Sequence, residues 1–307
     1  MTSDFYRYRA AAAVLAPRAQ IWRLPFGVIF AFGGQAVATP AIFMAIALVA
    51  SLIGDAHFDS VLNRLAALGG PGPLVAVLST FLGIVLGVAL AMKLLHGRGP
   101  RILLSWSRRF DWGDFARAAL VYGGLGVAAV IASLPFQDYV PNLPPASWAL
   151  WLLPALLVTF VQVFAEELVF RGYLQAHLAA RFARPVIWIG LPSLLFGAMH
   201  LPNAAVFGAN GWLVLLAPML IGAIAAHLTA RTGGIGAATG LHFANNCLGL
   251  LIVAVPGPFG ALALYLHPID IADVATVRPM ILTNLAMILV AYPLCLRATR
   301  PWEARIA

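Results

Sequence analysis

Long apolar runs that almost lack charge constrain this chain more than any other feature of its sequence. A helix needs about 20 apolar residues to cross a hydrocarbon core of about 30 Å. Eight candidate spans are read at roughly 24–53, 74–95, 115–134, 149–168, 186–201, 212–230, 235–255 and 280–296. The fifth is short and contains Pro192, and the fourth helix is expected to continue past the membrane edge toward Ala180.

The composition excludes a water-soluble protein. Of the 307 residues 62% are hydrophobic and 10% are charged, whereas a soluble chain carries about one-quarter charged residues. In hydrocarbon every backbone N–H and C=O must be paired internally, which leaves helices or a closed barrel. The apolar runs show no strict alternation, so helices are favoured. We expect an all-α polytopic membrane protein, a bundle of about eight transmembrane helices.

The distribution of basic residues predicts the orientation. With the N-terminus in the cytoplasm only Arg64 and Arg278 fall outside, and the net charge of +8 is explained by basic inner loops rather than by nucleic-acid binding. We therefore expect cytoplasmic ends at 1–23 and 298–307 around a single transmembrane domain at 24–297. The Ala- and Arg-rich sequence suggests a GC-rich bacterium, and so an inner-membrane protein. Both cysteines lie in apolar runs, and no disulfide is implied.

Two adjacent carboxylates stand out because nine of the eleven acidic residues lie in loops or tails. Glu166 and Glu167 follow an apolar stretch, where a charge costs at least about 2.5–3 kcal/mol. Arg171 lies four residues after Glu167 on the same helical face, which predicts a structural ion pair. Glu166 points about 100° away and is not neutralised by that pair. A carboxylate without its own cation in a low-dielectric pocket suits a general base, although a locking ion pair is the structural alternative.

Two of the seven histidines lie deep in apolar runs. His200 has Phe196 at i−4, and His242 has Asn246 at i+4, each pair on one helical face. A lone histidine in a membrane is usually a satisfied core residue. A second histidine, an asparagine and an unpaired glutamate on three separate helices favour a functional site instead. Asn245 lies on a different face and is interpreted as a helix-packing donor.

Three short motifs carry a resemblance to a known family. They are Glu-Glu-x-x-x-Arg at 166–171, Phe-x-x-x-His at 196–200 and His-x-x-x-Asn at 242–246. Their types and order resemble the CAAX-protease and bacteriocin-processing (CPBP or Abi) family of intramembrane proteases, which includes the type II CAAX prenyl endopeptidases. The resemblance covers a motif-bearing core at about 148–255.

The resemblance implies a peptidase that cleaves a membrane-associated peptide or protein inside the bilayer. Glu166 and His200 would hold and activate water, and His242 with Asn246 would stabilise the oxyanion. Donors of that kind are worth about 3–4 kcal/mol each. Glu167, Arg171 and Phe196 would support these groups. A glutamate mechanism without metal or cofactor is favoured.

The same residues also allow other mechanisms and functions. Zinc held by Glu166, His200 and His242 would match the two-histidine, one-glutamate style of catalytic sites, although no His-Glu-x-x-His motif is present. A transporter or proton relay also uses intramembrane acids, but no internal repeat is found. A non-catalytic immunity or scaffold protein is the third alternative. If spans four and five are straight, Glu166 and His200 would differ in depth by about 15–20 Å, which the active site cannot allow.

Overall fold

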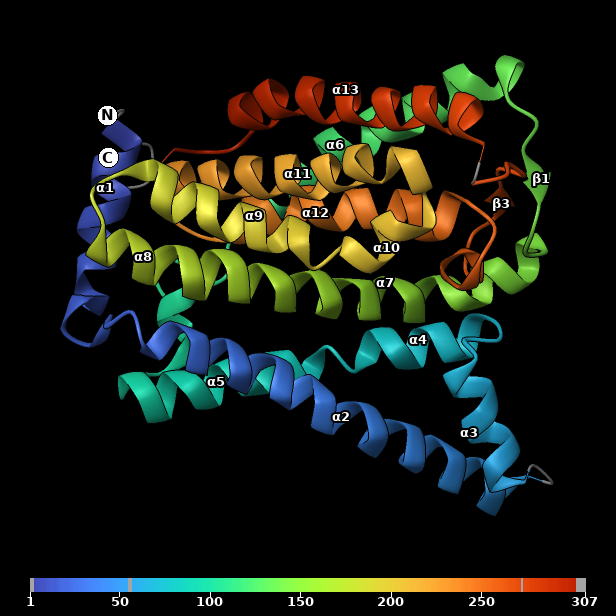
Figure 1. Ribbon diagram of the computed structural model, residues 1–307, viewed down its shortest axis with the longest axis horizontal. Helices are drawn as coiled ribbons and strands as arrows, with labels where there is room; N and C mark the ends of the chain where they lie inside the picture. Colours follow the sequence, from blue (N-terminus) through green and yellow to red (C-terminus); the bar gives the residue numbers. More distant parts are fainter. Residues whose placement is uncertain (1–2, 55–56, 272, 302–307) are drawn as a thin grey trace.

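A computed structural model describes residues 3–54, 57–271 and 273–301 of the chain. The last part of the predicted cytoplasmic tail, from residue 302 onward, and the first two residues of the N-terminal segment lie outside the described residues. The described chain is a bundle of roughly parallel and antiparallel helices with one small patch of strands at one end (Figure 1).

Six helices in the described chain are long and apolar enough to cross a membrane. They are α2 (Arg23–Ile53), α4 with α5 (Pro71–Ser79 and Leu82–His96), α6 (Trp112–Ser133, extended to Phe136), α7 with η4 and α8 (Pro145–Glu167, Leu168–Gln175 and Ala176–Arg181), α11 (Gly211–Thr232) and α13 (Val274–Ala298). The prediction of an all-α polytopic membrane protein is confirmed, as is the continuation of the fourth helix beyond residue 168.

Two of the eight predicted spans are shorter than expected. The fifth forms η5 and α9 (Val186–Gly190 and Leu191–Ala198) and ends before His200, because the chain turns there and starts again as α10 (Leu201–Val206). The seventh forms α12 and η7 (Gly236–Cys247 and Leu248–Ile252), after which the backbone becomes extended. By length, these two do not qualify as complete spans.

A three-stranded sheet of two-residue strands ends the seventh span. Strand β3 (Tyr265–Leu266) lies between β1 (Val140–Pro141), which it pairs antiparallel, and β2 (Val253–Ala254), which it pairs parallel. The helix expected to reach residue 255 therefore stops at Ile252, since the next backbone groups bond to β3. The remaining short elements are α1 (Ser3–Ala12), η1 (Ala13–Arg18), α3 (Phe58–Ala66), η2 (Pro100–Leu103), η3 (Leu134–Phe136), η6 (Gly208–Asn210) and η8 (Pro258–Gly260).

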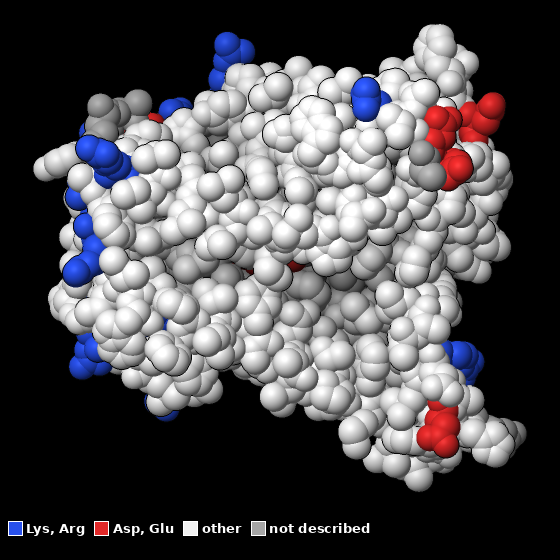
Figure 2. Space-filling view, in the orientation of Figure 1, with Lys and Arg blue, Asp and Glu red and all other residues white. Residues whose placement is uncertain are grey.

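Charge is concentrated at the two ends of the bundle. On the face shown in Figure 2, most basic residues lie at the end that holds α1, whereas acidic residues gather near the small sheet, and the surface between is almost uncharged. Both ends of the described chain lie at the α1 end (Figure 1). This uncharged belt between charged ends is what an integral membrane protein presents to lipid.

Glycines let α2 and α5 touch backbone to backbone. A Cβ on Gly34 would lie 2.1 Å from the carbonyl oxygen of Gly83, and one on Gly87 would lie 2.1 Å from that of Phe30. Small residues four apart are typical of close helix pairs in membranes, where dispersion contacts replace the hydrophobic driving force. The pair α2–α5 therefore forms one wall of the bundle.

We expect Gly87→Ala to destabilise the protein by about 1–3 kcal/mol, because the added methyl group forces the two backbones apart. Gly33→Ala is the matched control, since a Cβ there meets nothing within 4 Å, and it should be neutral or slightly stabilising. Thermal unfolding in detergent, followed by circular dichroism, compares the two variants. Equal midpoints for both would contradict the close packing.

Candidate active site

A long helical hairpin brings the first two motifs to the same depth. The helix that starts as α7 runs through η4 and α8 to Arg181, and the chain returns from Val186 through η5 and α9. Glu166 lies fifteen residues before Arg181, and His200 lies fourteen after Val186. At about 1.5 Å per residue both are roughly 21–23 Å from the turn. The depth mismatch that would follow from two straight spans ending at the membrane edge is not found, because the fourth helix continues past Glu166 to Arg181 before the chain returns.

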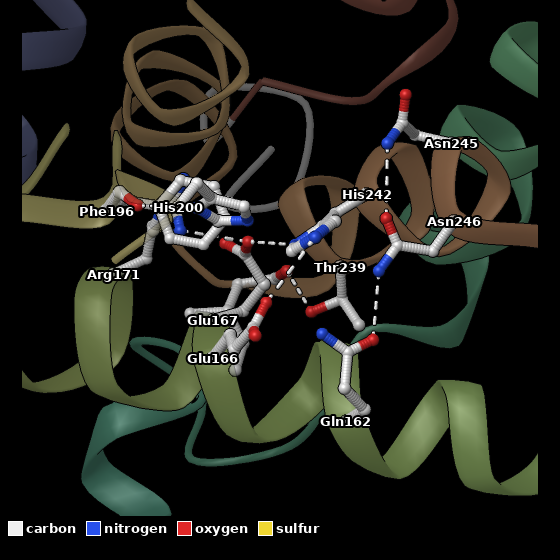
Figure 3. A network of polar contacts seen from close by, with 11 residues as sticks. Gln162, Glu166, Glu167, Arg171, Phe196, His200, Thr239, His242, Asn245 and Asn246 are labelled. Carbon is white, nitrogen blue, oxygen red and sulfur yellow. Dashed lines mark hydrogen bonds and ion pairs between the residues drawn. The ribbon is translucent and has the colours of Figure 1, made fainter. Parts of the chain in front are cut away.

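The predicted ion pair between Glu167 and Arg171 is present and fully enclosed. Arg171 Nη1 lies 3.0 Å from Glu167 Oε1, and the two side chains are 1% and 0% exposed. The same oxygen accepts a hydrogen bond of 2.8 Å from His242 Nδ1, so Glu167 joins α7 to α12 (Figure 3). A carboxylate paired with guanidinium is ionised and can only accept. Nδ1 of His242 must therefore carry a proton.

The other nitrogen of His242 faces Glu166. Nε2 lies 3.5 Å from Glu166 Oε2, a separation at which the two groups interact electrostatically (Figure 3). A bare imidazole nitrogen and an ionised carboxylate oxygen repel each other, because both present lone pairs. The contact is favourable when one proton is shared by the pair, held either by the glutamate or by the imidazole. Glu167 thus holds His242 so that its Nε2 faces Glu166.

Phe196 packs against three of the predicted site residues. Its ring lies 4.7 Å from the guanidinium carbon of Arg171, and its centroid is 5.1 Å from that of His200 and 5.4 Å from that of His242. Its carbonyl oxygen also accepts a hydrogen bond of 2.8 Å from Nδ1 of His200. With Nδ1 donating, the neutral His200 ring keeps Nε2 as an acceptor. Phe196 therefore fixes both the position and the tautomer of His200.

A cavity of about 490 Å³ is lined by three of the four predicted catalytic side chains. Glu166, His200 and Asn246 line it together, and His242 contacts Glu166 at its edge. In the described part of the chain no hydrogen bond joins Glu166 directly to His200, and both side chains line this cavity. Figure 2 shows acidic atoms at the bottom of a hollow midway between the charged ends of the molecule. The cavity is thus open at the depth where lipid would surround the bundle.

An amide network orients Asn246. Its Nδ2 donates to Gln162 Oε1 at 2.9 Å, and its Oδ1 accepts from Asn245 at 3.1 Å. The side-chain oxygen of Asn245 accepts a hydrogen bond of 2.9 Å from the Tyr122 hydroxyl. Asn245 therefore joins two helices, as expected, and also holds the side chain of Asn246. Gln162 was missed by sequence reasoning, although it lies one helical turn before Glu166 on the same face. Its amide nitrogen points toward Glu166 (Figure 3).

The described residues contain no preformed cluster of zinc ligands. Among the described residues, no group of three or more His, Cys, Asp or Glu side chains is arranged to hold a metal ion. Glu166 approaches His242, and His200 lines the same cavity as Glu166. The predicted roles of the individual residues, with or without a metal, stay predictions.

Replacing Arg171 by alanine tests the buried pair. We expect Arg171→Ala to lose about 3–5 kcal/mol of stability, because it leaves the Glu167 carboxylate buried without its cation. Arg184→Ala, at an exposed position in the hairpin turn, is the control and should change stability by less than about 0.5 kcal/mol. Thermal unfolding in detergent is the measurement. An Arg171→Ala protein as stable as the wild type would show that the pair is not enclosed.

Comparison with known proteins finds one family model and one curated relative. Residues 147–248 match the family model described as type II CAAX prenyl endopeptidase Rce1-like. The uncharacterized protein YyaK of Bacillus subtilis is 27% identical over 169 residues, which cover 54% of this chain and 56% of that protein. No solved structure matches the chain.

The matched segment contains the hairpin, the buried ion pair and all three motifs. The resemblance drawn from the motifs is therefore confirmed by a comparison that uses the surrounding residues as well. Residues 147–248 of this integral membrane protein are thus similar to the type II CAAX prenyl endopeptidase Rce1-like family.

Proposed function

We propose that this chain is an intramembrane endopeptidase that hydrolyses a peptide bond of a membrane-associated peptide or protein. The observation that supports this most is the single cavity lined by Glu166, His200 and Asn246, with His242 held against Glu166. The match to a peptidase family over residues 147–248 favours the same reaction. The charge distribution favours cytoplasmic termini, and we propose the bacterial inner membrane as the location.

In the proposed mechanism Glu166 is the general base. Water in the cavity attacks the peptide carbonyl carbon and gives one proton to Glu166, while the Nε2 acceptor of His200 orients the water. Negative charge develops on the carbonyl oxygen, which accepts hydrogen bonds from His242 Nε2–H and from the Asn246 amide. Glu166 then passes its proton to the leaving nitrogen and the C–N bond breaks, which returns the Glu166–His242 pair to its starting state. The second water proton stays on the new carboxyl group, which loses it to the amine product or to solvent.

This assignment uses the one proton that the Glu166–His242 contact requires. When that proton is on His242, Glu166 is ionised and ready to accept another, and Nε2 of His242 is a donor. A proton on Nε2 of His242 thus prepares both groups: Glu166 can act as the base, and His242 can donate to the oxyanion.

Glu166→Gln keeps the shape of the side chain but removes its basicity. We expect cleavage to fall by about 10²–10⁴-fold while the protein still inserts and folds. His200→Gln should have a comparable effect on the rate. Cleavage of a membrane-reconstituted substrate, measured beside thermal unfolding, separates catalysis from stability. Full activity in the Glu166→Gln protein would exclude the proposed mechanism, and failure of both variants to insert would favour a scaffold role.

Gln162→Leu tests the amide network. The substitution removes the acceptor for Asn246 Nδ2, so we expect a loss of about 10–100-fold in kcat from a misplaced donor. Gln35→Leu is a matched control, because Gln35 lines the same cavity but is bonded to Thr80 and not to Asn246. A larger effect at Gln35 than at Gln162 would count against oxyanion stabilisation by Asn246.

A chelator distinguishes the proposed metal-free glutamate mechanism from a zinc-dependent one. If Glu166 acts as a general base without a metal, dialysis against EDTA should leave the cleavage rate unchanged. A loss of activity that Zn²⁺ restores would replace the proposed mechanism with a metal-assisted one, in which these three side chains would be the ligands to examine first.

A further inference from the structure

The loop between α5 and α6 forms a basic recess at the α1 end of the molecule. The recess has a volume of about 740 Å³, and four of its lining side chains are guanidinium groups, those of Arg98, Arg101, Arg108 and Arg109. In the described part of the chain none of these four forms an ion pair with a carboxylate. Four like charges around one hollow repel one another, so the arrangement favours an anion between them.

The backbone of the recess is held in place and is not a loose tail. Gly97 ends α5 in a left-handed conformation with φ of 60°, and a Cβ there would lie 2.2 Å from Nη1 of Arg18. The neighbouring His96 is buried and bonds through Nδ1 to the Arg18 carbonyl at 2.9 Å. Arg108 also has a positive φ, of 58°, a conformation that is uncommon for a residue with a side chain. The guanidinium groups therefore surround a preformed hollow.

An apolar groove leads out of the recess along α5. A second hollow of about 640 Å³ shares Arg98 and the backbone at 97–100 with the recess and extends over Leu86 and Leu90. These two leucines are 62% and 44% exposed. Lys93 lies in the same groove, between the leucines and the arginines. The combined surface is basic at the end of the bundle and apolar toward its middle.

We propose that this surface is a binding site for an anionic phospholipid. The phosphate of the headgroup lies between the four guanidinium groups, which match phosphate oxygens in pairs. One acyl chain follows the groove over Leu86 and Leu90. A free phosphate ion would use the recess alone, so the adjoining apolar groove is the reason to choose a lipid. The site is separate from the catalytic cavity and does not depend on the proposed peptidase activity.

Native mass spectrometry of the purified full-length chain in detergent tests the site. Phosphatidylglycerol and phosphatidylcholine with identical acyl chains are the probes, and inorganic phosphate is the headgroup-only probe. We expect the wild type to retain phosphatidylglycerol roughly tenfold better than phosphatidylcholine, since several arginines contribute to the attraction. Arg98→Gln/Arg101→Gln should remove most of that preference. Arg181→Gln/Arg184→Gln, at exposed positions outside the recess, should keep it.

A third variant, Leu86→Asn/Leu90→Asn, tests the acyl-chain groove and should weaken retention of both lipids. Thermal unfolding of each variant ensures that a loss of binding is not a loss of fold. Equal retention of the two lipids by the wild type, or an equal loss in both arginine pairs, would overturn the proposal. Inorganic phosphate that displaces phosphatidylglycerol at equal concentration would overturn the choice of a lipid in favour of a free anion.

Discussion

The ion pair between Glu167 and Arg171 is the interaction on which the geometry of the site depends. It lies inside an apolar bundle with almost no exposure, where removing two charges from water is costly and adds little net stability. Its effect is orientation, because an ionised Glu167 forces Nδ1 of His242 to be the donor. That hydrogen bond joins α7 to α12 and turns Nε2 of His242 toward Glu166.

The rest of the site is built on this fixed histidine. Phe196 fills the space beside Arg171 and both imidazoles, and its carbonyl orients His200. The hairpin of α7–α8 and η5–α9 places Glu166 and His200 at similar distances from its turn, so the two side chains reach the same cavity. Two adjacent carboxylates thus have different surroundings: Glu167 is paired with its own cation, whereas Glu166 faces the cavity beside Nε2 of His242.

Local rules predicted part of this arrangement. The i,i+4 spacing was sufficient to predict the Glu167–Arg171 pair, and the low charge content predicted the membrane bundle. Sequence reasoning predicted that the fourth helix continues beyond residue 168, but it placed Glu166 near the membrane edge because the apolar window ends there. Gln162 was missed because a single glutamine in an apolar helix carries no signal until its partner, Asn246, is in place. The basic recess likewise requires a folded loop, since positive inner loops alone predict charge without a hollow.

The protonation of the His242 ring is the most direct test of this account. Nitrogen-15 NMR of the purified protein with labelled histidine, assigned by comparison with His242→Gln, reports which ring nitrogens carry protons. The account predicts a protonated Nδ1 under all conditions in which the protein is folded, and an Nε2 that exchanges its proton with Glu166. A ring with a bare Nδ1 and a proton fixed on Nε2 would contradict it, because Glu167 would then not be the acceptor that orients the site.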